Sequence, residues 1–314
     1  MARRRNKGES GKPLLRSARS YAGLSIGAAV VTFALKFLAY KLTDSVGLLS
    51  DAMESVVNLT AAMMAFWMLT VASLPPDKEH TYGHSKAEYF SSGVEAMLIL
   101  VAAGSIAWAA WGRLAHPQPL EHVWLGLAVS ALAAAINGGV ATVLYRASLR
   151  LNSITLRADG AHLMTDVYTS GGVIVAVTLV QATGWIILDP LIAFLVAVNI
   201  IWTGYRLMND TLHGLLDSAL PPRERQLVET VLDQYRERGV DFHAFRSRIA
   251  GQRRFISVHV LVPGAWTVQE GHNLVEQIEY QIHTAIPKCT VTTHVEPMED
   301  PIAFADQNLD REQS

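Results

Sequence analysis

Two pairs of side chains that could bind a metal occur at helical spacing within apolar parts of this 314-residue chain. Glu54 and Asn58 lie in SVGLLSDAMESVVNLTAAM, and His162 and Asp166 lie in RADGAHLMTDVYTSGG. Residues four apart stack on one helix face. An ionisable residue near a bilayer centre costs about 2.5–3.5 kcal/mol on insertion scales, so its presence there indicates a functional role. One pair alone would equally suit hydrogen bonds between helices, whereas both pairs together favour a metal or proton site.

The four side chains of these pairs could surround a single ion. Two donors from each of two helices allow the tetrahedral arrangement that zinc favours. With histidine neutral, the carboxylates of Glu54 and Asp166 balance the charge of a divalent cation. Asp51 lies one turn before Glu54 on nearly the same stripe, so it is a candidate residue of the entry path of the ion.

A second cluster lies in the connection PPDKEHTYGHSKAEYF, where Asp77, His80 and His84 follow the pattern D-x2-H-x3-H. This spacing can place two imidazoles and a carboxylate around one metal. The glutamate of the zincin motif H-E-x-x-H is absent, so the pattern does not indicate a metalloprotease.

A third set of histidines lies in the polar C-terminal part of the chain. It comprises His243, His259, His272 and His294, followed by Glu296. His259 and His294 fall in alternating patterns typical of strands. Spacing alone favours scattered surface histidines over a site for this set.

The composition predicts a membrane part and a soluble part. Half of the residues are hydrophobic and only 17% are charged, against about 25% in soluble domains. The single cysteine, Cys289, excludes a disulfide scaffold and cysteine-rich zinc modules. Segments of about 20 apolar residues can span the hydrocarbon core. We expect six spans, near residues 21–43, 46–72, 86–112, 121–147, 157–182 and 187–209.

The distribution of lysine and arginine predicts the orientation. The basic N-terminus and the connections that carry Lys78, Lys86, Arg146 and Arg206 lie on one side, which the positive-inside rule assigns to the cytoplasm. Both termini are therefore expected there. We divide the chain into a disordered basic arm (1–18), a six-helix transmembrane domain (19–210), a cytoplasmic domain of order α-β-β-α-β (211–300) and a flexible tail (301–314).

Over about residues 15–300 the chain resembles the cation diffusion facilitators. Three features carry the resemblance: the two four-spaced pairs, the D-x2-H-x3-H pattern running into GHSKAEYF, and LLDSALP leading into a domain with RFISVHV and TTHVEP. The resemblance implies an α-helical membrane protein of six transmembrane helices with a C-terminal α+β cytoplasmic domain of ferredoxin-like, metallochaperone-like fold.

The resemblance also implies roles for individual residues. Glu54, Asn58, His162 and Asp166 match the family's transport site, and Asp77, His80 and His84 match its loop site. His243, His259, His272, His294 and Glu296 match positions that bind a pair of metals at the dimer interface. Lys86 and Asp217 match a salt bridge between protomers. Family members are typically homodimers that export divalent metal in exchange for protons by alternating access.

This sequence departs from the family pattern in the pair on the second span, which is usually two carboxylates, or a histidine with an aspartate, and here is Glu54 with Asn58. The amide removes one charge and one anionic ligand, so the set suits zinc but also iron(II), cobalt or manganese. We expect Zn²⁺ or another divalent transition metal as substrate and regulatory ligand, no nucleic acid partner, and residence in the bacterial cytoplasmic membrane. The alternatives are a membrane-embedded metal enzyme, a sodium–proton antiporter and a non-transporting metal sensor or scaffold.

Overall fold

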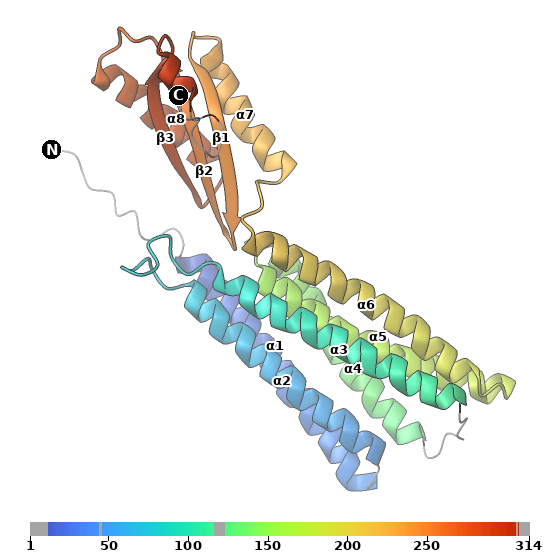
Figure 1. Ribbon diagram of the computed structural model, residues 1–314. Helices are drawn as coiled ribbons and strands as arrows, with labels where there is room; N and C mark the ends of the chain where they lie inside the picture. The colour runs from blue at the N-terminus through green and yellow to red at the C-terminus, as the bar shows by residue number, and fades with distance from the viewer. Residues whose placement is uncertain (1–11, 44–45, 116–122, 306, 308–314) are drawn as a thin grey trace. The chain divides into compact units, whose positions relative to one another are not determined.

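The chain folds into two compact units, Met1–His213 and Gly214–Ser314. The computed structural model describes residues 12–43, 46–115, 123–305 and 307 (Figure 1). The first unit is helical and the second combines helices with a small sheet, which confirms the predicted fold class.

Six helices of the described chain are long and apolar enough to cross a membrane, so the protein is a multi-pass membrane protein. Their bounds are α1 (Lys12–Thr43), α2 (Val46–Ala72), α3 (Ala87–Ala115), α4 (Val123–Leu151), α5 (Ile154–Thr183) and α6 (Leu188–Leu215). At 1.5 Å per residue, the 32 residues of α1 measure about 48 Å, well above the roughly 30 Å of hydrocarbon. The helices therefore extend beyond the apolar layer.

The prediction of a disordered arm over residues 1–18 is wrong from Lys12 onward, because α1 begins there. Residues 1–11 lie outside the described part of the chain. Pro13 stands in the first turn of α1, where the missing N–H would have no helical partner in any case. At the other end of the unit, α6 continues to Leu215, beyond the expected limit near residue 209.

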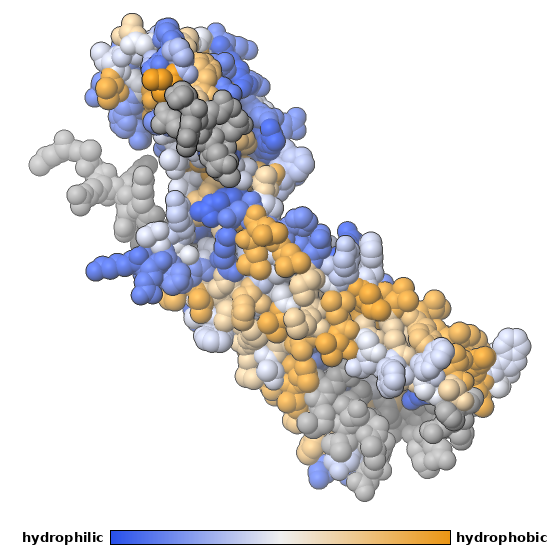
Figure 2. Space-filling model, in the orientation of Figure 1, coloured by the Kyte–Doolittle hydropathy of each residue, from blue (hydrophilic) through white to orange (hydrophobic). Residues whose placement is uncertain are grey.

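The outer surface of the helical unit is apolar, as a lipid-facing surface must be. Trp67, Trp108 and Leu195 are 62%, 80% and 71% exposed. Figure 2 shows hydrophobic residues gathered over these helices, whereas the C-terminal unit is mostly hydrophilic. Between the helices, small residues permit close approach. A Cβ on Gly172 would lie 2.7 Å from Val196 of α6, so that glycine sets the spacing of α5 and α6.

The C-terminal unit has the predicted element order. Helix α7 (Pro222–Arg236) precedes β1 (Asp241–Ala250) and β2 (Arg253–Val262), and α8 (Val268–Ala285) precedes β3 (Cys289–Pro297). The sheet order is β1-β2-β3, with β1 antiparallel and β3 parallel to β2. The β1–β2 connection needs two residues, and Gly251 supplies the positive φ of that turn.

The two faces of the sheet differ in burial, which explains where the histidines lie. Alternate residues of β2, including Ile256, Val258 and Val260, join a hydrophobic core with α7 and α8. Side chains of a strand alternate between faces, so His259 points away from that core. In the sheet register His259 pairs with His243 of β1 and with His294 of β3.

The tail after residue 300 is not flexible throughout, contrary to the prediction. Pro301–Phe304 forms a 3-10 turn (η1), and the Asp300 side chain accepts a hydrogen bond from the N–H of Ile302 at its start. Ala303 is buried. The signal was present in the sequence, because an aspartate followed by a proline typically begins such a turn.

Candidate metal centres

Three of the four predicted transport-site residues lie together between α2 and α5. The imidazole Nε2 of His162 lies 2.8 Å from the Oδ1 of Asn58, and the Nδ2 of Asn58 donates to the Oδ2 of Asp166. All three side chains are buried, with 5%, 5% and 7% of the residue exposed. The amide of Asn58 thus links the two ionisable groups of α5.

This network orients the histidine. Because the amide nitrogen of Asn58 donates to Asp166, its amide oxygen faces His162. An amide oxygen can only accept a hydrogen bond, so the ring nitrogen that faces it must be an N–H. Nε2 of His162 therefore carries the proton and Nδ1 keeps a free lone pair. That Nδ1 is buried and has no hydrogen-bond partner among the described residues. An unprotonated imidazole nitrogen is the form that binds metal.

Asn137 of α4 is a fifth member of this site that the sequence analysis missed. Its Nδ2 donates to the same Asp166 oxygen at 3.0 Å, and its residue is only 3% exposed. Its Oδ1 is buried without a partner among the described residues, so it is a further oxygen donor next to the site. A lone asparagine in an apolar span has no four-spaced partner, so spacing could not single it out.

The other predicted members of the site are only partly placed. Glu54 and Asp51 lie within α2 at the expected helical spacing, but their side chains fall outside the part of the structure that is described. The backbone of α2 puts Glu54 one turn before Asn58 on one helix face. Their participation therefore stays a prediction.

The start of α5 is fixed by hydrogen bonds to α3, and this positions the site. Ser153 caps α5 by accepting from the N–H of Leu156. Its hydroxyl also donates to the buried carboxylate of Glu88, and the Thr155 hydroxyl donates to the Glu88 carbonyl at 3.2 Å. These bonds hold the depth and rotation of α5, on which His162 and Asp166 depend.

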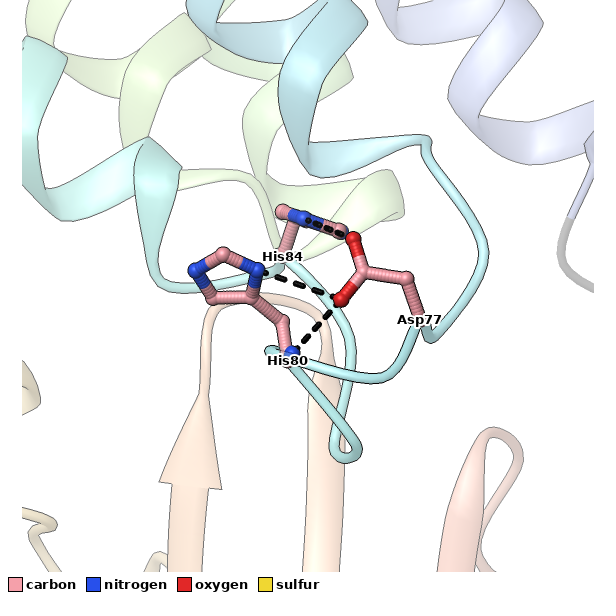
Figure 3. Close-up of side chains that lie close together, drawn as sticks. All are labelled: Asp77, His80 and His84. Carbon is pink, nitrogen blue, oxygen red and sulfur yellow. Dashed lines mark hydrogen bonds and ion pairs between the residues drawn. The ribbon is translucent and has the colours of Figure 1, made fainter.

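The three side chains of the loop cluster, Asp77, His80 and His84, lie close together (Figure 3). Nδ1 of His80 and Nε2 of His84 each lie 3.3 Å from one oxygen of Asp77, and the three ligand atoms lie within 4.8 Å of one another. The backbone N–H of His80 donates to Asp77 at 2.6 Å and holds the pKa of that carboxyl below its ordinary value. Asp77 therefore stays an anion, which is the form a cation needs.

In the C-terminal unit, histidines and Glu296 form a cluster on the face of the sheet that points away from α7 and α8. Oε2 of Glu296 lies 2.8 Å from Nε2 of His243 and 3.2 Å from Nδ1 of His259, and its Oε1 lies 3.4 Å from Nε2 of His294. Glu296 is buried, whereas His294 is 63% exposed in its side chain. The strand register accounts for this cluster, so the interpretation of scattered surface histidines does not hold for these three.

His272 is not part of this cluster within the chain. It lies on the exposed side of α8, and in the described residues no hydrogen bond or ion pair joins it to Glu296. The other side of the cluster is covered by the tail. The Phe304 ring lies edge-on to His243 at 5.5 Å, and the side chain of Gln307 lies 3.4 Å from the same imidazole.

The predicted salt-bridge residues Lys86 and Asp217 lie in different units. Asp217 forms an ion pair at 3.4 Å with Arg248 of its own chain. Its backbone has a φ of 57°, in the left-handed region, at the point where α6 has ended. A bridge between protomers stays a prediction.

Comparisons with known proteins cover both units. The profile of the cation efflux transmembrane domain matches residues 23–216, and that of the cation efflux protein cytoplasmic domain matches residues 220–298. An uncharacterised transporter of Synechocystis sp. is 55% identical over 286 residues, 91% of this chain and 92% of its own. The cation-efflux pump FieF of Yersinia pestis is 30% identical over 269 residues, 86% and 89% of the two chains. A solved structure of CzrB matches 25% of this chain and 96% of its own at 35% identity, with a TM-score of 0.24.

Proposed function

The chain belongs to the cation diffusion facilitator family of cation-efflux transporters, and from this premise we propose that it exports a divalent transition-metal ion. Zn²⁺ is the first candidate, with Fe²⁺, Mn²⁺ and Co²⁺ as the others. The ion is held by Glu54, Asn58, His162 and Asp166 and leaves in exchange for protons by alternating access.

The observation that carries this proposal is the buried cluster between α2 and α5. An imidazole, an amide and a carboxylate meet there within hydrogen-bond distance, and an imidazole nitrogen and the Asn137 amide oxygen have no described partner. Buried polar atoms without partners cost free energy, typically about 1–3 kcal/mol each. A bound cation would take the place of hydrogen bonds among these groups, with the deprotonated imidazole and carboxylate as ligands.

The ligand atoms of this site suit a metal ion that is intermediate between hard and soft. One imidazole with carboxylate and amide oxygens suits Zn²⁺ and also Fe²⁺, Mn²⁺ and Co²⁺, since the order of affinities alone does not select among them. The amide of Asn58 binds a cation more weakly than a carboxylate would, because it brings no charge. We therefore expect weaker binding and broader selectivity than a site with two acids on α2 would have.

Exchange for protons follows from the chemistry of these ligands. A metal binds the deprotonated imidazole and carboxylates, so its arrival releases protons and its departure lets them return. Close groups of this kind titrate as one unit rather than singly. If the empty and the metal-loaded forms open to opposite sides, an inward proton gradient drives metal outward.

The cytoplasmic cluster suits a regulatory metal in a homodimer. His243, His259 and Glu296 have ligand atoms within 4.8 Å of one another, and exposed His294 is free of the sheet core. Metal at this face would supply the positive charge that draws two protomers together, with His272 as a candidate ligand across the interface. Lys86 and Asp217 would add a salt bridge between protomers.

The loop cluster and the orientation complete the proposal. Asp77, His80 and His84 would capture a cation at the surface, where two of the three side chains are about half exposed. By the positive-inside rule this loop and both termini face the cytoplasm, where an exporter takes up its substrate.

A sodium–proton antiporter is the second candidate, and the amide at Asn58 is what favours it. Sodium prefers neutral oxygen donors over imidazole, so His162 would then have no role as a ligand. If the protein transports sodium, replacement of His162 should leave the flux intact. If it transports a transition metal, the same replacement should abolish the flux.

The test is flux into proteoliposomes, with Zn²⁺, Fe²⁺, Mn²⁺ and Na⁺ compared and internal pH recorded. We expect Zn²⁺ uptake with opposite proton movement in the parent protein and loss of both in His162→Ala. The control is His213→Ala, an exposed histidine of α6, which should transport at the parental rate. If His162→Ala also moved metal at the parental rate, the assigned site would be wrong. If neither the parent nor Asn58→Asp moved any ion, a sensor or scaffold would be supported instead.

A further inference from the structure

Besides Asp166, Glu88 and Asp189, which is paired with Arg113, two acids are buried in the described part of the helical unit. Glu95 of α3 is 1% exposed and Asp159 of α5 is 2% exposed. Their neighbours Ala96 and Ala158 pack in one core cluster where α3 meets α5, and the two carboxyl groups are close enough to interact electrostatically. We call these two residues the acid pair.

Each member of the acid pair has one oxygen engaged and one oxygen free. The Ser91 hydroxyl donates to Oε1 of Glu95 at 3.3 Å, and the Ser25 hydroxyl of α1 donates to Oδ1 of Asp159 at 2.8 Å. Oε2 of Glu95 and Oδ2 of Asp159 are buried and have no hydrogen-bond partner among the described residues. One buried oxygen of each carboxyl group therefore has no hydrogen-bond donor among the described residues.

No described cation neutralises the acid pair. Neither residue forms an ion pair with a described basic side chain, and the nearest guanidinium on α5, that of Arg157, is paired with Asp210 at 2.8 Å. His162 lies three residues beyond the pair on α5. On α3, Glu88 lies seven residues before it.

Among the side chains that the structure describes, the other helices around the acid pair also present no cation at its level. On α1, the Arg19 guanidinium lies over the Phe66 ring, and Lys36 is eleven residues from Ser25, about 16 Å along the helix. The described side chains of α2, from Ser55 onward, include no ionisable group. Other described basic groups at this end of the helices include the exposed arginines Arg146 and Arg150 of α4 and Arg206 of α6.

Two facing carboxylates in a low-dielectric interior cannot both stay ionised without a positive charge, and one proton shared between them is the familiar solution. A metal fits this place less well. Only two oxygens are free, the serine hydroxyls already donate, and the described residues with three clustered metal ligands lie elsewhere. A proton needs just the two oxygens that are present.

We propose that Glu95 and Asp159 form a proton-binding site that exchanges its proton as metal enters and leaves the transport site. This inference deepens the proposed proton exchange and rests on it for its role in transport. Asp159, His162 and Asp166 are spaced i, i+3 and i+7, so they lie on one face of α5. The acid pair is about 4.5 Å along the helix from His162.

The position explains how proton and metal could be coupled. A divalent cation at the transport site places two positive charges about one helix turn from the acid pair. That charge repels the shared proton and stabilises both carboxylates, so metal binding releases the proton. When metal leaves, the two carboxylates again need a proton, and they take one from the side that is then open.

The first test counts protons in the full-length protein. Proteoliposome flux of Zn²⁺ is measured with an internal pH dye for the parent, for the double variant Glu95→Gln, Asp159→Asn, and for Asp189→Asn as control. Asp189 of α6 is also buried, but its carboxylate accepts from the Arg113 guanidinium at 2.8 Å. We expect the double variant to move about one proton fewer per metal ion, and Asp189→Asn to match the parent. An unchanged proton count in the double variant would overturn the inference.

The second test does not depend on transport. Infrared spectroscopy of the purified protein at neutral pH should show a protonated-carboxyl band that fades on addition of Zn²⁺ and is absent in the double variant. Should the parent move metal without protons yet show this band, the proposed antiport would fail and the proton-binding site would stand. A band that persists unchanged in the double variant would reject the site even if antiport were present.

Discussion

Replacement of Asn58 by aspartate changes the charge of the transport site without changing its shape. The amide nitrogen of Asn58 now donates to Asp166, and a carboxylate at this position would face that acid instead. Two unit charges about 4 Å apart repel by about 4 kcal/mol at an effective dielectric constant of 20. Since about 1.4 kcal/mol is a factor of ten, this repulsion strengthens proton binding by about a thousandfold, and the metal-free variant should hold about one more proton than the parent at pH 6.

The expected result is a change in the number of protons released. Zn²⁺ must displace the additional proton, so binding to Asn58→Asp should release about one proton more than binding to the parent, with tighter affinity at high pH. Calorimetry in buffers of different ionisation enthalpy counts these protons. Asn58→Leu is the control, because it removes the ligand without adding charge and should weaken binding with no additional proton. If Asn58→Asp bound Zn²⁺ with parental affinity and proton release, Asn58 would not contact the metal.

Three further predictions concern the C-terminal unit. His259→Ala removes the imidazole that contacts Glu296 from the central strand, and it should abolish metal-dependent dimer stabilisation, followed by sedimentation, while zinc binding at the transport site persists. The backbone N–H of Thr267 holds the pKa of Glu270 below its ordinary value. This carboxylate therefore stabilises the fold above the unfolded pKa near 4.5, and the stabilisation is lost as the pH falls through the lower pKa of the folded state. The Tm difference between the parent and Glu270→Gln should shrink in acid. Burial raises the pKa of Cys289 to about 12, so a maleimide should label it at pH 8 only after denaturation, and rapid labelling of folded protein would contradict its burial.

The sequence predicted the membrane helices well because the bilayer imposes a simple rule on them. Each span needs about 20 apolar residues, and every such segment is helical in the structure. The ends were harder to predict, since beyond the hydrocarbon nothing in hydropathy distinguishes a continuing helix from a loop. For this reason the prediction missed the start of α1 at Lys12 and the continuation of α6 to Leu215.

The candidate sites were predictable where spacing within one element carries the signal. Asn58 with the α5 pair was found from four-residue spacing, and the loop cluster from its local pattern. Asn137 could not be found in this way, because its role depends on how α4 packs against α5. The cluster around Glu296 depends on the strand register, which brings its histidines side by side. Spacing along the sequence does not contain this information and favours scattered surface histidines.

The acid pair shows a different limit. Asp159 shares the stripe of His162 and Asp166, a signal that was available in the sequence. Glu95 stands at the edge of an apolar segment, where a glutamate commonly lies in the aqueous interface. Only the contact of α3 with α5 reveals that Glu95 is buried near another acid.

Anomalous diffraction at the zinc edge, from crystals of the full-length protein grown with zinc, tests the central claim most directly. We predict a peak between α2 and α5, bounded by Asn58, His162 and Asp166. Peaks at the loop and cytoplasmic histidines with none among these three side chains would contradict the account.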